Sequence, residues 1–211
     1  MTYAVFLGMM IPLAFLILLL KSENRMMMLF FAWGMVAFVL SLAANTALCA
    51  ALEIDTLRLS VTWSPVVEEL LKALPLLYFL FRKEKTELPL VYFAMAAGIG
   101  FSIQENYLYL IGFTSAGESI AFYVVMRSIT TCLMHGVTTA MIGYGVTLIK
   151  KYEIMVAPLL FGLFSVTIIL HALFNLYINS SVRLIGMLMP VLLYGASLIV
   201  LNQKNDLTDD A

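Results

Sequence analysis

The sequence places side chains of catalytic types inside stretches that are otherwise apolar. Carboxylates can accept a proton from water or bind a metal ion, and imidazoles can bind a metal ion or polarise water. An amide side chain can stabilise the oxyanion that forms when a peptide bond is attacked. Together these groups are suited to hydrolysis. The candidate side chains are Glu68, Glu69, Lys72, Glu105, Arg127, His135, His171 and Asn175.

The segment "EELLK" brings a lysine within reach of two glutamates on one helix. Lys72 follows Glu69 by three residues and Glu68 by four, and both spacings bring side chains together on a helix. The two glutamates themselves point about 100° apart. One glutamate can therefore face a cavity while the other is anchored to Lys72 or to a neighbouring helix. A self-neutralising structural cluster is the alternative interpretation.

Two further motifs repeat the helical spacing. "HALFN" places His171 and Asn175 four residues apart, and "QENYLY" does the same for Glu105 and Tyr109. Gly98 and Gly100, in "GIGFS", are interpreted as positions where helices pack closely.

The composition identifies the membrane as the surrounding solvent. Of the 211 residues, 63% are hydrophobic and 12% are charged, and the mean hydropathy is +0.99. Soluble domains contain about 25% charged residues. The net charge of -1 and the lack of a basic block argue against nucleic acid as a partner. Cys49 and Cys132 both lie in apolar runs, where buried thiols are expected rather than a disulfide.

Apolar stretches long enough to cross a bilayer alternate with short polar breaks. We predict an all-α, polytopic membrane protein, with residues 1–211 forming a single integral membrane domain. The first stretch has no preceding basic residue and is expected to be a retained span. The seven predicted spans are 3–20, 26–52, 61–81, 88–112, 121–149, 154–178 and 184–201.

Basic residues in the polar breaks predict the orientation of the chain. Cytoplasmic loops collect lysine and arginine, and the first, third and fifth breaks hold most of these residues, whereas Arg58 and Arg183 are the basic residues of the even-numbered breaks. The N-terminus should therefore face outside and the C-terminus the cytoplasm. At about 1.5 Å per residue, Glu68 and Glu69 then lie about 10 to 12 Å below the outer end of their helix. Glu105, His171 and Asn175 fall at similar depth, so the polar side chains should meet in the outer half of the membrane.

Four motifs, in this order and spacing, resemble the PrsW family of intramembrane proteases. They are "EELLK", "GIGFSIQENYLYL", "HGVTTAMIGYG" and "HALFN", within about residues 60–180. The family is distantly similar to the CAAX prenyl endopeptidases and to the Abi group of bacterial membrane proteins. Lys72 matches the PrsW pattern better than the arginine of the prenyl endopeptidases, which is one residue further on.

The resemblance implies hydrolysis of a peptide bond in a membrane-anchored protein of a bacterial or archaeal cell membrane, and the predicted depth of the polar side chains puts the cut near the outer face. By carry-over, Glu68 or Glu69 activates water, His135 and His171 bind a metal or polarise that water, and Asn175 completes the site or holds the oxyanion. Glu105 is a further candidate ligand, and Lys72 and Arg127 have structural or substrate-positioning roles. Family members are linked to the first cut of membrane-bound anti-sigma factors, so an anti-sigma factor is the implied substrate.

Zinc is the expected ion, because two imidazoles and a carboxylate form a standard catalytic zinc set. No His-Glu-x-x-His helix is present, so the ligands must come from separate helices. A metal-free site with a glutamate base is the alternative mechanism. A proton-coupled transporter or channel that uses the same carboxylates and histidines is the alternative function, and a catalytically silent scaffold that binds membrane segments is a further one.

The orientation can be tested by labelling introduced cysteines in intact cells. A cysteine at Thr86 should resist an impermeant thiol reagent because the third break is predicted to be cytoplasmic, and a cysteine at Ser115 should react. The parent chain, with only Cys49 and Cys132, is the control for background labelling. The reverse pattern would contradict both the orientation and the depth assigned to the site.

Overall fold

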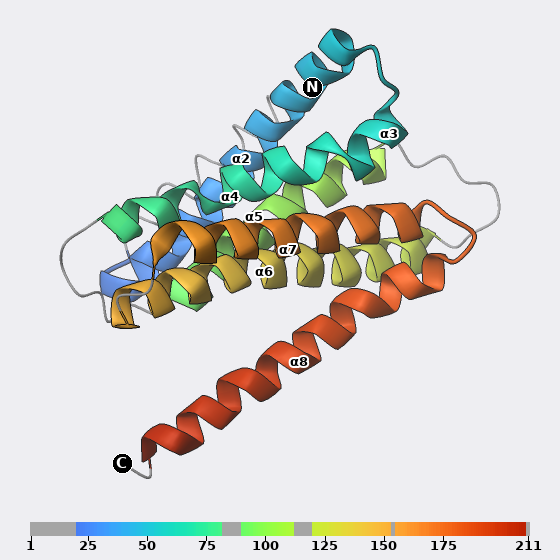
Figure 1. Cartoon of the computed structure of the whole chain (residues 1–211). Helices are drawn as coiled ribbons and strands as arrows, with labels where there is room; N and C mark the ends of the chain where they lie inside the picture. Colours follow the sequence, from blue (N-terminus) through green and yellow to red (C-terminus); the bar gives the residue numbers. More distant parts are fainter. Residues whose placement is uncertain (1–19, 82–89, 112–119, 153–154, 210–211) are drawn as a thin grey trace.

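The computed structural model describes residues 20–81, 90–111, 120–152 and 155–209. These residues form an all-α structure of seven helices, as predicted (Figure 1). The helices are α2 (Ser22–Leu52), α3 (Thr56–Val61), α4 (Trp63–Phe81), α5 (Leu90–Ile111), α6 (Ile120–Tyr152), α7 (Val156–Ile178) and α8 (Arg183–Asp209).

Six of the predicted spans correspond to the long helices α2 and α4 to α8, whereas span 3–20 falls almost entirely outside the described residues. The predicted break at 53–60 is not simply a loop. It contains the short helix α3, whose first turn is capped by Asp55 Oδ1, which accepts a hydrogen bond from the backbone N–H of Arg58 at 2.8 Å. Such a cap satisfies an N–H that a helix terminus otherwise leaves unpaired.

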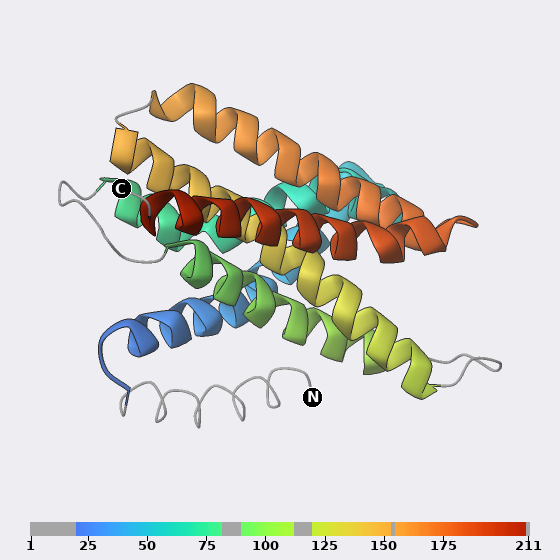
Figure 2. The ribbon, with the colours of Figure 1, turned by 90° about the horizontal axis from the view of Figure 1, so that it is seen from below.

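The helices form a bundle in which α5 packs between α2 and α6, and α7 packs against α6 and α4 (Figures 1 and 2). Helix α8 contacts α6 and α7 and runs at an angle to them in Figure 1. The helices that carry the sequence motifs, α4 to α7, are therefore neighbours.

Small residues allow α5 to approach its neighbours closely, as predicted. A Cβ atom on Gly98 would meet the backbone carbonyl of His135 on α6, and one on Gly100 would meet the carbonyl of Phe31 on α2. Close backbone contact through glycine is common between membrane helices. Gly98 therefore sets the distance between α5 and α6 at the level of a candidate site histidine.

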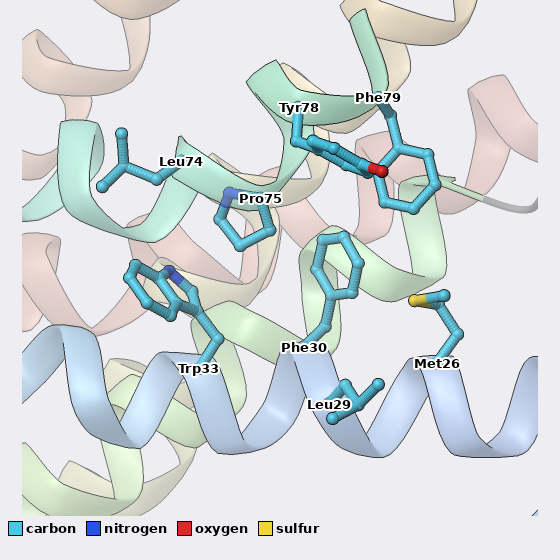
Figure 3. A pocket seen from close by; sticks show the side chains of 8 residues that line it. All are labelled: Met26, Leu29, Phe30, Trp33, Leu74, Pro75, Tyr78 and Phe79. Atoms are coloured by element: carbon cyan, nitrogen blue, oxygen red, sulfur yellow. The ribbon is translucent and has the colours of Figure 1, made fainter. Parts of the chain in front are cut away.

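Apolar side chains fill the bundle away from the candidate polar residues. Phe30 lies between Phe79 and Phe93, at ring centroid distances of 6.0 and 5.6 Å. Next to these rings, a cavity of about 450 Å³ lies between α2 and α4 (Figure 3), and all the side chains that line it are apolar or aromatic. Among the described helices, Glu23–Leu52, Val124–Tyr152 and Val156–Ile178 are long and apolar enough to cross a membrane. Large apolar side chains such as Phe161 and Leu192 are exposed on the surface, as expected for a protein that spans a bilayer more than once.

Substitution of Gly98 by alanine should destabilise the protein, because the added methyl group would push α6 away at His135. Overpacking of this kind costs about 1–3 kcal/mol. Gly162→Ala on α7 is the matched control: nothing lies within 4 Å of a Cβ there, and alanine is favoured over glycine in a helix by about 1 kcal/mol. Thermal unfolding of both variants in detergent would check this, and equal stability of Gly98→Ala and the parent would contradict the packing interpretation.

Candidate active site

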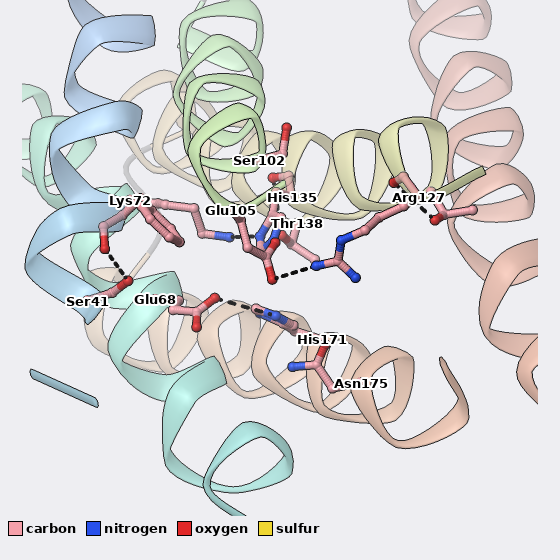
Figure 4. Close-up of polar contacts among 12 residues, drawn as sticks. Ser41, Glu68, Lys72, Ser102, Glu105, Arg127, His135, Thr138, His171 and Asn175 are labelled. Carbon is pink, nitrogen blue, oxygen red and sulfur yellow. Dashed lines mark hydrogen bonds and ion pairs between the residues drawn. The ribbon is translucent and has the colours of Figure 1, made fainter. Parts of the chain in front are cut away.

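Polar side chains from four helices meet inside the bundle (Figure 4). Glu68, Glu69 and Lys72 come from α4, Glu105 from α5, His135 from α6 and His171 from α7. The imidazole rings of His135 and His171 lie 4.8 Å apart, centroid to centroid, and are nearly perpendicular. These residues meet, as predicted, and their depth in the outer half of the membrane stays a prediction.

Glu69 is the anchored member of the glutamate pair. Its side chain is fully buried, and Oε1 accepts hydrogen bonds from Lys72 Nζ at 2.7 Å, His171 Nδ1 at 2.8 Å and Thr138 Oγ1 at 3.2 Å. These donors belong to three helices, α4, α7 and α6. A buried carboxylate needs such partners because removal from water is costly. Glu69 therefore fixes the positions of the groups around it.

Glu68 has a different environment, as the 100° separation predicts. Its side chain is 12% exposed. Oε2 lies 3.6 Å from His171 Nε2, and Oε1 lies 3.4 Å from Asn45 Nδ2 on α2. These are longer and weaker contacts than those of Glu69. Glu68 is therefore the carboxylate of the pair that another molecule can reach.

His135 is held through both of its ring nitrogens. Nδ1 lies 2.9 Å from Lys72 Nζ, and Nε2 lies 2.8 Å from Glu105 Oε2. An ammonium group can only donate, so Nδ1 accepts a hydrogen bond and Nε2 carries the proton donated to Glu105. The ring orientation of His135 is thus determined by Lys72 on one side and by Glu105 on the other.

Glu105 also contacts Arg127 of α6. Arg127 Nη2 lies 3.4 Å from Glu105 Oε1, and the guanidinium carbon lies 3.5 Å from the ring centroid of Tyr109. The guanidinium therefore stacks on an aromatic ring while it balances the charge of Glu105. Tyr109 shares the helix face of Glu105, as the spacing predicts.

Asn175 lies beside His171 on α7, one helical turn further along (Figure 4). Its Nδ2 donates to the backbone carbonyl of Ser60 at 2.8 Å, which links α7 to α3. The side-chain amide has a second N–H. In this structure, then, the amide of Asn175 joins the site to the short helix before α4.

Three of the residues could hold a metal ion together. Glu68, His135 and His171 each offer one ligand atom, and these atoms lie within 4.8 Å of one another. Zinc ligands lie about 2.0–2.2 Å from the ion, so two of them are at most about 4.4 Å apart. Small side-chain movements would bring the three atoms from their present separation of up to 4.8 Å to the separation that zinc requires. His171 is already oriented for this role, because Nδ1 donates to Glu69 and leaves Nε2 facing Glu68.

The donor set therefore fits a divalent ion, with one condition. Both ring nitrogens of His135 already have partners, so His135 must give up its contact with Lys72 or with Glu105 to become a ligand. Glu105 was predicted as a metal ligand. In the structure its Oε2 instead contacts His135 Nε2, and Glu105 is not one of the three candidate ligands.

Two residues at the site were not among the predicted ones. Asn45 on α2 contacts Glu68, and Thr138 on α6 donates to Glu69. Both could have been predicted from the sequence. Asn45 is an amide inside an apolar helix, and Thr138 follows His135 by three residues and so shares its face.

Removal of Lys72 should lower stability strongly, because Glu69 would remain as a buried charge without its cationic partner. The loss expected for breaking such a pair is about 3–5 kcal/mol. The double variant Glu69→Gln/Lys72→Met should lose less than Lys72→Met alone, since no lone charge remains. Lys151→Met, at an exposed lysine of α6, is the matched control. Unfolding in detergent measures all three, and a loss in the double variant as large as that of Lys72→Met, or larger, would contradict the assigned pairing.

The comparison with protein families agrees with this geometry. A family model described as PrsW family intramembrane metalloprotease matches residues 22–201, which include every helix that contributes to the site. The comparisons with curated proteins and with solved structures found no match. The extent of the family match shows that this chain belongs to the PrsW family of intramembrane metalloproteases.

Proposed function

We propose that this metalloprotease cuts its membrane-anchored protein substrate with Glu68 as the carboxylate that accepts a proton from the attacking water. One observation supports this choice over Glu69. Glu68 is partly exposed and faces His171 Nε2, whereas Glu69 is fully buried and its Oε1 is committed to three donors. A base must lie within reach of the water that it activates.

The other residues orient this reaction. Glu69 fixes the ring of His171 through Nδ1, and Lys72 and Glu105 fix the ring of His135. We assign Glu105 to positioning rather than to ligation, because it sits on His135 Nε2 outside the group of candidate ligands. Asn175 has one amide N–H that is not used by Ser60, and this group is suited to stabilise an oxyanion.

Glu68, His135 and His171 are the residues that would hold the metal ion, and zinc is the ion that this ligand set favours. When bound, such an ion lowers the pKa of water and polarises a carbonyl. A carboxylate has two oxygens, so one oxygen of Glu68 would remain available to accept a proton if the other held the ion. After the proton is accepted, Glu68 can pass it to the leaving amine.

We further propose that residues 1–211 form one membrane domain with seven spans, an outer N-terminus and a cytoplasmic C-terminus. The distribution of lysine and arginine between alternate breaks supports this orientation. With this orientation, we expect the site in the outer half of the bilayer and the cut near the outer face. An anti-sigma factor in a bacterial or archaeal membrane is a candidate substrate that meets these conditions.

Reconstitution in liposomes tests the proposed chemistry. The parent protein should cleave a single-span reporter protein, and Glu68→Gln should cleave at least about 100-fold more slowly, because it lacks the base. Glu23→Gln, at an exposed glutamate in the first turn of α2, should match the parent. Proton flux without cleavage would support a transporter instead, and cleavage by Glu68→Gln at the parent rate would contradict the assigned base.

Metal content of the same preparations gives a second measurement. The parent should contain about one divalent ion per chain, and His171→Ala should contain little. A chelator should remove both metal and cleavage, and zinc should restore both. Full cleavage at undetectable metal would leave Glu68 and the histidines acting without an ion.

A further inference from the structure

A cavity of about 360 Å³ lies beside the site, between the end of α5, the first half of α6, the end of α7 and the start of α8. Unlike the apolar cavity in Figure 3, it is lined by two arginines, Arg127 and Arg183, together with the hydroxyl side chain of Thr131. The proposed mechanism does not use this cavity, although Tyr109 and Phe174 of its lining belong to the "GIGFSIQENYLYL" and "HALFN" motifs.

The cavity adjoins the reacting groups through two elements. Phe174 and Ile178 line it, and they follow His171 by three and seven residues on the same face of α7. Arg127 extends from the cavity to Glu105, which in turn contacts His135 (Figure 4). A peptide lying in the cavity can therefore extend directly into the site.

The guanidinium of Arg127 has donor capacity that its neighbours do not use. It has five N–H donors, and its ion pair with Glu105 is long, at 3.4 Å. Among the described residues, two buried atoms near this cavity have no hydrogen-bond partner. They are Arg127 Nε and Thr131 Oγ1, and Thr131 is only 1% exposed. Unpaired buried donors are costly and favour a ligand that supplies acceptor oxygens.

We propose that this cavity is a substrate subsite that binds an aspartate or glutamate side chain close to the bond that is cut. Both charged residues of the lining are cationic, and an arginine fork matches the two oxygens of a carboxylate. Arg127 contacts Glu105, which contacts His135, and an extended peptide advances about 3.3 Å per residue, so the acidic residue should lie within a few residues of the scissile bond. Arg127 and Arg183 are then specificity-determining residues. This inference rests on the proposed protease function.

Binding of synthetic single-span peptides to the inactive Glu68→Gln protein in nanodiscs tests the subsite. Each peptide has one apolar span and an outer flanking segment in which a single Asp, or the isosteric Asn, is moved through successive positions. At one or two positions the Asp peptide should bind about tenfold more tightly, as one charge-assisted hydrogen bond predicts. Labelled peptide and fluorescence anisotropy give the affinities.

The variants identify the residues responsible. Added to the Glu68→Gln background, Arg127→Gln should reduce the preference for Asp to within about twofold, and Arg183→Gln should reduce it in part. Arg127→Lys retains the charge without the fork and should give an intermediate value. Arg58→Gln, at an exposed arginine of α3 near the same end of the bundle, is the matched control and should keep the full preference.

The outcomes separate this inference from the proposed function. Equal binding of Asp and Asn peptides, absence of binding by every peptide, or a preference that survives both Arg127→Gln and Arg183→Gln would overturn the subsite. Binding with the predicted preference, combined with no cleavage by protein that retains Glu68, would sustain the subsite and contradict proteolysis. If the parent cleaves Asp and Asn peptides equally well, the subsite is contradicted and the proposed protease function is not.

Discussion

The buried ammonium group of Lys72 is the contact on which the arrangement of the site depends. It lies 2.7 Å from Glu69 Oε1 and 2.9 Å from His135 Nδ1, and its side chain is fully buried. Through Glu69 it also determines the position of His171. One cation thus connects both histidines, although they lie on different helices. A charge in such a location is tolerated only with close partners, so the helices must pack at fixed distances for the chain to fold.

Helical spacing made part of the site predictable. The separation between Glu68 and Glu69 implied that the two glutamates would have different environments, and the structure confirms that Glu69 is anchored while Glu68 is accessible. The sequence could not tell which glutamate had which role, because that depends on the rotation of α4 against α6 and α7. It also provided no reason to expect the contact between Asn175 and Ser60, since the sequence predicts residues 53–60 only as a polar break and not as the helix α3. The cavity near Arg127 depends on the position of α8, which carries no motif.

The two histidines differ in how ready they are to bind an ion. His171 has one nitrogen fixed by a carboxylate and the other directed at Glu68, an arrangement typical of metal ligands. His135 has both nitrogens engaged and can bind only after a contact is lost. Metal binding would therefore be linked to a local rearrangement of Lys72 or Glu105. The stability of the bundle and the affinity of the site for metal are consequently not independent properties.

The single carboxylate oxygen of Glu69 that receives donors from α4, α6 and α7 also limits how the sequence can change over evolutionary time. A replacement of Glu69 alters the hydrogen bonding of Lys72, Thr138 and His171, and a replacement of any of these three alters that of Glu69, so substitutions at the four positions should be strongly epistatic. Viable lineages should therefore replace these residues jointly or retain all of them. In related sequences we therefore expect these four positions to vary together, and this covariation would be more informative than the residue at any one of them.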